Sequence, residues 1–287
     1  FNMQFSHIEM GIITDVGKAR QNNEDAGIIM PELGFCAVAD GMGGADAGEV
    51  ASAWVINNVL KKLKGKKDVC PEERCQAIKQ GVLQADQEIF QFAQEHQFPD
   101  GSGTTIISLL FNSWYSNEAL VLHVGDSRAY RWRAGALQQL GKDHTISAQT
   151  GIDEKKLPRV YHGILTKAIG TGKSSCPERT PVDVADEDLF VLCSDGLTKV
   201  ITDKKLAALL SKNNGLSVTE LAQFLVNEAL AAGGPDNVTV AVVRVKARPK
   251  NYSPSEAEEA ANAELEEQWS AVLAPADASE EDTRVPD

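Results

Sequence analysis

The stretch Phe35-Cys36-Ala37-Val38-Ala39-Asp40-Gly41-Met42-Gly43-Gly44 contains an apolar run, an acidic residue and a glycine-rich turn. The apolar run at its start predicts a buried β-strand. The residues after it carry small or apolar side chains every four positions, which predicts a helix with one buried face. These positions are Ala51, Val55, Val59 and Leu63. An acid between such a strand and helix, beside glycines that permit a tight turn, can direct its oxygens into a pocket.

Four further clusters repeat this combination of acids with Gly, Ser or Asn. They are Asn22-Asn23-Glu24-Asp25, Gly125-Asp126-Ser127-Arg128, Ser194-Asp195-Gly196 and Pro235-Asp236-Asn237. Two of them directly follow apolar runs, at 119–124 and 189–193. Several acids without matching Lys or Arg would repel one another in a shared pocket, and hard divalent cations with oxygen ligands relieve that repulsion. The clusters therefore predict a site for two or more metal ions such as Mg²⁺ or Mn²⁺.

The order of elements along the chain predicts the fold class. Apolar or alternating runs predict strands at 5–13, 35–39, 104–111, 119–124, 129–132, 136–140, 182–185, 189–193 and 238–245. Helical periodicity follows Gly43-Gly44 and Pro71, and it recurs at 203–210 and 218–231. Strands and helices thus come in blocks, with hairpins among the strands, rather than as repeated βαβ units. This arrangement predicts an α+β protein whose antiparallel sheets are covered by helices.

The composition divides the chain in two. We expect one domain over residues 1–246, closed by the last predicted strand, and an acidic tail over residues 247–287. The tail has three basic and eleven acidic residues and is rich in Ala, Glu, Ser and Pro, which is typical of disorder. The alternative is a helix at 255–273 that docks elsewhere through Trp269.

The charge and the cysteines restrict partners and location. The 287 residues carry a net charge of −13, which disfavours nucleic acids and anionic membranes as partners. No apolar stretch is long enough to span a bilayer, so we expect no membrane partner. The five cysteines form no disulfide framework, which is typical of free thiols in a reducing compartment. We therefore expect a cytoplasmic protein.

Motifs for other phosphate chemistries are incomplete. The segment Gly170-Thr171-Gly172-Lys173-Ser174 ends like a P-loop, but Lys167 stands where the first glycine is required. No cysteine is followed by Arg six positions later, which excludes a cysteine phosphatase loop. The five histidines form no cluster, so a metal centre built on His fits the sequence poorly.

Eight segments together carry a resemblance to a known family. They are residues 14–25, Val38-Ala39-Asp40-Gly41-Met42-Gly43-Gly44, Gly103-Thr104-Thr105, Val124-Gly125-Asp126-Ser127-Arg128, Asp143-His144-Thr145, residues 165–170, Cys193-Ser194-Asp195-Gly196-Leu197 and Pro235-Asp236-Asn237-Val238-Thr239. In this order they resemble the metal-dependent protein phosphatases, the PPM family of type 2C serine/threonine phosphatases, and the chain is similar to bacterial members. Each motif alone is weakly specific, whereas eight in the correct order are very specific.

The resemblance implies a four-layer αββα sandwich, in which two antiparallel β-sheets are flanked by helices. It also implies that two Mn²⁺ or Mg²⁺ ions are bound. Asp40 would bridge both ions, and the Gly41 carbonyl would contact one of them. Asp195 and Asp236 would bind the other ion, while Glu24 would act on the second through a water molecule.

The remaining implied roles are to bind a third metal ion, to support the metal-ligand residues and to bind the substrate. Asp126 with Asp195 would hold a third, weaker ion, and Asp25 and Asn237 would support the ligands. Arg20 would bind the substrate phosphate, so the implied catalytic residues are Arg20, Asp40 and Asp195. Taken singly, Asp195-Gly196 is more typical of a turn, and Asp126 has an alternative partner in Arg128.

The implied activity is hydrolysis of phosphoserine and phosphothreonine in proteins by a metal-activated water. The implied partners are phosphorylated proteins, among them a cognate bacterial Ser/Thr kinase and its substrates. Eukaryotic members place a His after Asp-Gly, whereas this chain has Met42, whose thioether cannot donate a proton, so no general acid is assigned. The segment 146–162 corresponds to the flap of bacterial relatives and is either a mobile surface loop or a substrate-selecting lid.

Two other functions share this fold. The first is a non-catalytic regulatory or binding member, which is expected to have lost metal ligands, whereas Asp40, Asp126, Asp195 and Asp236 are all present. The second is a phosphatase of anti-sigma-factor antagonists. Such proteins usually carry a sensor domain, for which we expect no room in this chain.

Overall fold

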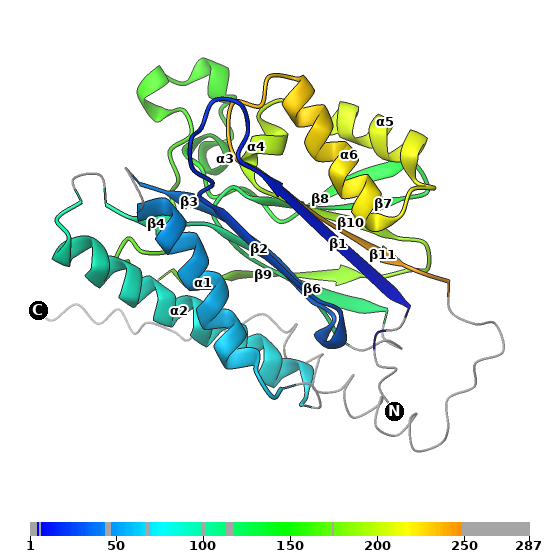
Figure 1. The fold of residues 1–287 in the computed structure, drawn as a ribbon, viewed down its shortest axis with the longest axis horizontal. Coiled ribbons are helices and arrows are strands. Elements are labelled where there is room, and N and C mark those ends of the chain that lie inside the picture. The colour runs from blue at the N-terminus through cyan, green and yellow to red at the C-terminus, as the bar shows by residue number, and fades with distance from the viewer. Residues whose placement is uncertain are drawn as a thin grey trace, which may run out of the picture.

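The computed structural model describes residues 5, 7–43, 47–66, 69–98, 101–112, 117–173 and 175–247. Two antiparallel β-sheets are stacked face to face, and helices cover both outer faces (Figure 1). The expected α+β architecture with four layers is therefore confirmed. The predicted tail, apart from Ala247, lies outside the described residues.

Each sheet combines strands from distant parts of the chain. The first sheet has the order β1 (Ile8–Asp15), β11 (Val238–Val245), β10 (Leu189–Cys193), β7 (Arg128–Arg133) and β8 (Ala136–Leu140). The second has the order β2 (Asp25–Met30), β3 (Phe35–Met42), β5 (Ile106–Phe111), β6 (Glu118–Val124) and β9 (Glu178–Asp183), and β4 (Gly103–Thr104) pairs with β3. The first and last strands that the structure describes, β1 and β11, thus lie side by side.

The central strands are apolar on both faces because both faces are buried. Along β3, Cys36 and Val38 belong to the core between the sheets, whereas Phe35, Ala37 and Ala39 belong to the core under the helices. Successive side chains of a strand point to opposite faces, which accounts for this division. An uninterrupted apolar run is therefore what a strand in the middle of four layers requires.

The helices form two groups. α1 (Ala47–Leu63) and α2 (Pro71–Glu95) cover the second sheet, whereas α4 (Asp195–Thr198), α5 (Asp203–Asn213) and α6 (Val218–Ala231) cover the first. Pro71 occupies the first turn of α2, as expected, and Ser217 with Glu220 forms a capping box at the start of α6. In the described part of the chain, no helix is both long and apolar enough to cross a membrane.

Short helices occupy two of the connections. A 3₁₀ turn, η1 (Pro31–Leu33), joins β2 to β3. Between β8 and β9 lie α3 (Ile146–Thr150), η2 (Glu154–Lys156) and η3 (Arg159–Tyr161), within the segment 146–162 for which the sequence left a surface loop or a lid open. Exposed Ile152, Val160, Tyr161 and Ile164 show that this segment packs little against the sandwich.

Several elements differ from the sequence-based expectation. β2 was not expected, because it is a half-buried edge strand interrupted by Gly27 and has little apolar pattern of its own. The predicted strand 104–111 is divided at Thr105 into β4 and β5. The strand expected at 182–185 lies instead at Glu178–Asp183, where Pro181 is tolerated because β9 is an edge strand.

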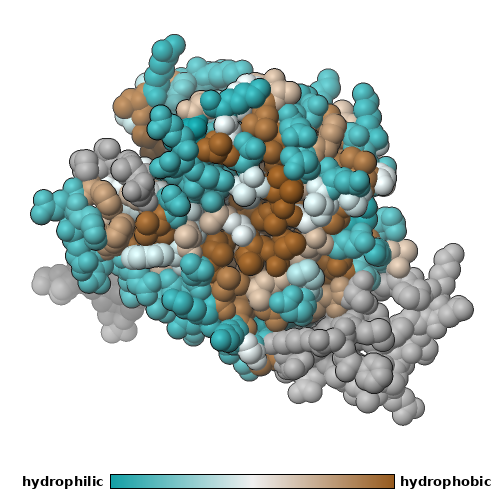
Figure 2. Space-filling model, in the orientation of Figure 1, coloured by the Kyte–Doolittle hydropathy of each residue, from teal (hydrophilic) through white to brown (hydrophobic). Residues whose placement is uncertain are grey.

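Apolar surface is concentrated on one open side of the sandwich. Figure 2 shows it between the two helical layers, on the side where Figure 1 places β1 and β2. These strands are the edges of the two sheets, and Ile12, Ile28 and Ile29 on them are only partly buried. The acidic clusters lie elsewhere, at one end of the strands.

Candidate active site

The acidic clusters meet at one end of the sandwich. Asp25 is the first residue of β2 and lies opposite Asp40 on β3 in the strand register. Asp195 begins α4 directly after β10, and Asp236 lies just before β11. Asp126 lies in the connection from β6 to β7. The antiparallel strands therefore bring together five acids that are separated by as many as 211 residues in sequence.

Two glycines allow the backbone segments of the site to approach closely. A Cβ atom at Gly41 would collide with the carbonyl oxygens of Gly48 and Glu24. A Cβ atom at Gly196 would collide with the carbonyl oxygen of Asn237. The glycine that follows Asp40 and the one that follows Asp195 are thus required by packing.

Asp25 and Asn237 connect the segments that carry the other acids. Asp25 Oδ2 accepts hydrogen bonds from Ser194 Oγ and Thr239 Oγ1, each at 2.7 Å. Asn237 Nδ2 donates to the carbonyl oxygens of Val16 and Asn22, each at 2.8 Å, and its Oδ1 accepts from the Glu24 amide at 2.8 Å. These side chains hold the β1–β2 loop against β10 and β11.

Thr104 and Thr105 fix the backbone of Asp40. The Asp40 amide donates to Thr105 Oγ1 at 3.0 Å, and the Asp40 carbonyl accepts from the Thr105 amide and from Thr104 Oγ1, each at 2.9 Å. The division between β4 and β5 thus places two threonine hydroxyls next to the acid. Sequence reasoning noted Gly103-Thr104-Thr105 as a motif but assigned the threonines no role.

The pKa values of three site carboxyls are raised. Burial, and then the nearby Asp25, Asp195 and Asp126 charges, raise the pKa of Asp40 well above its usual value. Burial and the Asp195 charge raise the pKa of Asp126 to about 7, and burial raises that of Asp25 to about 6. Desolvation and like charges both disfavour the ionised form, so a further positive charge in the site would favour ionisation of these carboxyls.

Two basic side chains lie among these acids. Lys199 Nζ is 2.7 Å from Asp195 Oδ2 and 2.6 Å from Asp236 Oδ2. Arg20 Nε is 2.8 Å from Asp236 Oδ1, and its side chain is 47% exposed at the rim of the site. Burial raises the pKa of Asp236, but Lys199 and Arg20 outweigh that effect and leave the pKa below its usual value. Sequence reasoning missed Lys199; its only signal was the four-residue spacing from Asp195.

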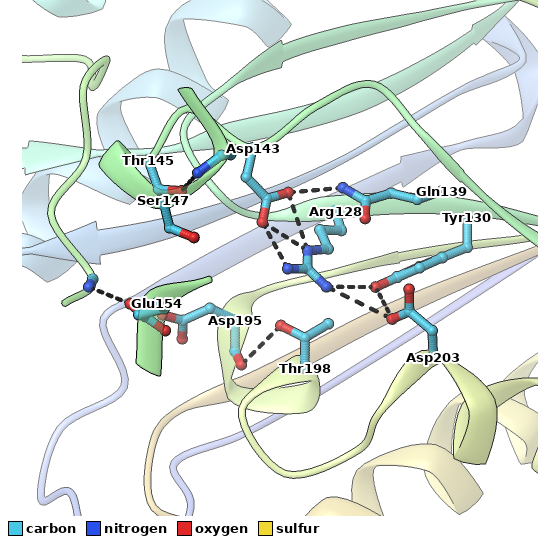
Figure 3. A network of polar contacts seen from close by, with 12 residues as sticks. Arg128, Tyr130, Gln139, Asp143, Thr145, Ser147, Glu154, Asp195, Thr198 and Asp203 are labelled. Atoms are coloured by element: carbon cyan, nitrogen blue, oxygen red, sulfur yellow. Dashed lines mark hydrogen bonds and ion pairs between the residues drawn. The ribbon is translucent and has the colours of Figure 1, made fainter. Parts of the chain in front are cut away.

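Arg128 is not the partner of Asp126. Figure 3 shows the Arg128 guanidinium between Asp143 and Tyr130. Its Nη2 lies 2.7 Å from Asp143 Oδ2, and its Nη1 donates to Tyr130 Oη at 3.0 Å. No ion pair joins Asp126 to a cation among residues 117–173 or elsewhere in the described chain. The alternative role that the sequence left open for Asp126, a pair with Arg128, does not occur.

His144 has partners on both ring nitrogens. Its Nδ1 accepts a hydrogen bond from the Gly125 amide at 3.0 Å, and its Nε2 lies 3.0 Å from Glu178 Oε2. The ring stacks on His123 with a centroid distance of 4.6 Å. This residue therefore braces the loop that carries Asp126.

The donor set fits hard divalent cations. Buried Asp25 Oδ1 and Asp195 Oδ1 have no hydrogen-bond partner among the described residues, although unsatisfied buried oxygens are costly. Carboxylate and carbonyl oxygens are the ligands that Mg²⁺ and Mn²⁺ prefer. No three His, Cys, Asp or Glu side chains in the described ranges already surround one point as metal ligands do. Lys199 instead lies between Asp195 and Asp236.

Comparisons with known proteins identify the family. Residues 18–231 match the family described as protein phosphatase 2C. The chain is 36% identical over 240 residues to the serine/threonine protein phosphatase PstP of Mycobacterium tuberculosis, covering 81% of this chain and 44% of that protein. It is 29% identical over 239 residues to the serine/threonine phosphatase stp of Listeria monocytogenes, covering 80% of this chain and 93% of that protein. This chain belongs to the protein phosphatase 2C family.

A solved structure of a relative agrees with this assignment. The PstP catalytic domain, determined in complex with two manganese ions, superposes with a TM-score of 0.69 and 32% sequence identity. The match covers 84% of this chain and 99% of that one. The resemblance drawn from eight sequence segments is thereby confirmed. The chain spans less than half the length of the full PstP protein.

Proposed function

We propose that this chain is a serine/threonine protein phosphatase that depends on Mn²⁺ or Mg²⁺. One observation carries the proposal: acids from five separate segments converge at one end of the sandwich with too few cations to neutralise them. Membership of the protein phosphatase 2C family supports the reaction, and the manganese-bound PstP structure supports the metal. A non-catalytic role is not favoured, because none of the expected metal ligands has been lost.

We assign the metal ligands to the acids that meet in the site. Asp40 and the Gly41 carbonyl, with Asp195 and Asp236, would hold two ions, and Glu24 would contribute through water. Asp126 would join Asp195 at a third, weaker position. The buried oxygen of Asp195 that has no hydrogen-bond partner supports its place among the ligands.

When bound, the two ions would supply a water molecule of lowered pKa as the nucleophile and positive charge next to the phosphoryl oxygens. The protein's own contribution is to orient and to bind. Asp25 and Asn237 hold the ligand-bearing segments in register through the hydrogen bonds described above. Arg20, at the exposed rim, can direct its Nη groups to phosphate oxygens while Nε stays on Asp236.

The substrates we propose are phosphoserine and phosphothreonine in proteins, with a cognate Ser/Thr kinase and its targets as partners. The names of the relatives support phosphoproteins as the substrate class. We further propose that residues 1–246 are the catalytic domain, that 247–287 are an acidic tail and that the protein acts in the cytoplasm. The free cysteines Cys36, Cys75 and Cys193 buried in the domain support a reducing compartment.

The test is phosphate release from p-nitrophenyl phosphate and from a phosphothreonine peptide, with Mn²⁺ and with EDTA. We expect turnover only with the metal, and a strong loss in the Asp236→Asn variant. Glu73→Gln is a matched control, because Glu73 lies on the first turn of α2, is 58% exposed and pairs with Lys66 away from the acids of the site. Metal-independent turnover, or full activity of the Asp236 variant, would sink the proposal, and a preference for phosphotyrosine would contradict the substrate class.

A further inference from the structure

Lys199 occupies a place in the site that the proposed ligand set does not explain. Its ammonium bridges Asp195 Oδ2 and Asp236 Oδ2 at 2.7 and 2.6 Å, and these two oxygens come from different segments. Both acids are proposed to bind the same metal ion. A monovalent cation of the protein therefore lies between the two carboxylates that a divalent cation would share.

The local fold holds Lys199 in this position. It follows the single turn of α4, and its amide donates to the Asp195 carbonyl at 2.8 Å, so the side chain starts one turn from the acid. The close contact between Gly196 and Asn237 presses this turn against the start of β11, which brings Asp236 within reach. Lys199 is thus placed by the backbone and not only by the attraction of the acids.

The Lys199 charge acts on the whole site. It is the cation that offsets the raised pKa values of Asp40 and Asp126, although it touches neither carboxyl. The other basic side chain, Arg20, contacts Asp236 and lies 3.9 Å from Glu24. Without Lys199, these acids would depend on the charge of Arg20, which acts on Asp40 from the exposed rim of the site.

We propose that Lys199 is a tethered counter-ion that competes with the divalent cation for Asp195 and Asp236. This inference rests on the proposed metal-binding function of those two acids. In the metal-free protein the ammonium holds the two ligands together and lowers their repulsion. Binding of the metal displaces it, and the 43% exposure of the side chain lets the flexible lysine move into solvent.

The consequence is a lower metal affinity and a more stable metal-free protein than the same site would have without the lysine. To bind Asp195 and Asp236, a metal ion must first break their contacts with Lys199. Its apparent binding free energy is therefore reduced by the free energy of those contacts. An exposed charge-assisted contact of this kind corresponds to about a tenfold change in dissociation constant. The effect should appear in direct binding, independently of turnover.

The experiment measures Mn²⁺ binding by calorimetry and by the electron paramagnetic resonance signal of free Mn²⁺. We expect Lys199→Met to bind Mn²⁺ about tenfold more tightly than the parent, and to unfold at a lower temperature in EDTA. Lys199→Gln, which keeps a hydrogen-bond donor and provides a second variant if the first folds poorly, should also bind more tightly. Lys199→Arg should stay near the parent. Lys205→Met is the matched control, since Lys205 is 44% exposed and pairs with Glu228 on the helical face.

The outcomes separate this inference from the function on which it rests. If the parent binds Mn²⁺ and the Lys199 variants bind it equally or more weakly, the counter-ion role is wrong and the phosphatase proposal stands. If the parent itself binds no Mn²⁺, the metal site and the counter-ion role both fail. A tighter complex in both neutral variants, with Lys199→Arg and Lys205→Met unchanged, supports competition by the lysine charge.

Discussion

The two ends of the β-sandwich carry the same residue type in opposite settings. At the end away from the site, Asp183 contacts Arg131 and Arg133 at 2.6 Å each, and Asp188 binds Arg133 through both of its oxygens. The hydrogen bonds from Arg133 and Arg131 lower the pKa of Asp183. At the site end, Asp40 and Asp126 are buried with raised pKa values. Partners, and not the residue type, decide which acids stabilise the fold and which repel.

This contrast gives a physical criterion for the function of each acid. A buried carboxylate held by arginine is satisfied within the fold, and replacing it removes the charge-assisted hydrogen bonds that it accepts. A buried carboxylate among other acids lowers stability until a cation binds, so its presence indicates a ligand from outside. Substitutions of acids at the site end should therefore reduce activity without lowering stability. Substitutions at the opposite end should lower stability and leave activity intact.

The largest effect is expected for Asp40→Asn at the site end. Because Asp40 is proposed to bridge both metal ions, turnover should fall on the order of a thousandfold, about 4 kcal/mol in activation free energy. The same change removes a charge from a repelling cluster, so the variant in EDTA should melt no lower than the parent. Phosphate release and thermal melting test both statements together. Retained turnover would remove Asp40 from the metal site, and a large drop in melting temperature would show that its charge stabilises the fold.

At the opposite end, Asp188→Asn should affect stability and leave turnover intact. The Asp188 side chain is fully buried, and its two oxygens accept from Arg133 and from the Ala185 amide. Losing its charge should lower the free energy of unfolding by about 2 kcal/mol, measured by urea denaturation. Glu187→Gln in the same turn is the control, since its amide oxygen can still accept from the Ala247 amide. An equal loss in both variants would show that the turn, and not the Arg133 pair, carries the stability.

A smaller effect is expected for Arg20→Ala, because this side chain is half exposed and its ion pairs in the described structure are with Asp236 and Glu24. Losing a charge-assisted contact to the phosphate should raise KM about tenfold, or about 1.4 kcal/mol, with little change in kcat. Steady-state kinetics and a Mn²⁺ titration separate the two roles. Unchanged kinetics would remove Arg20 from the phosphate site, and a weakened metal affinity would instead make it a support for Asp236.

How far the sequence predicts the structure depends on whether the signal is local. α6 and β11 were predicted at the ends they have in the structure, because each has an uninterrupted apolar pattern with clear boundaries. α4 was missed, since a single turn is too short to show a period. The position of β2 depends on pairing with β3 and not on its own residues. Long-range pairing is therefore what the sequence pattern alone did not supply.

The same distinction applies to the site. The acids were found because each stands beside residues that permit turns, which is a local signal, and the structure brings all of them to one end. Lys199 and the supporting hydroxyls of Ser194 and Thr239 gave no such signal, because their partners Asp236 and Asp25 lie on other segments. A surface lysine in a sequence is usually only a solvated charge. Its partners could be identified only in the folded chain.

The last prediction concerns the pH dependence of stability. It tests the contrast between the two ends of the sandwich at one carboxyl group, that of Asp126. The pKa of Asp126 is raised to about 7 in the fold, from a usual value of 3.8, so the metal-free folded protein binds a proton more tightly than the unfolded chain. Ionisation of this group lowers the free energy of unfolding. That loss is absent below about pH 4 and grows until about pH 7, so stability falls as the pH rises. Asp126→Asn removes this loss. In EDTA, its melting temperature relative to the parent should increase by about 2–4 °C, or about 1 kcal/mol, between pH 5 and pH 6. Asp25 titrates in the same direction and is present in both proteins, whereas loss of the Asp126 charge also lowers the pKa of Asp40, which adds to the same increase. A difference in melting temperature that does not change with pH would mean that the Asp126 carboxyl is ionised throughout this range. Asp126 would then not belong to the acids whose charge lowers stability until a cation binds.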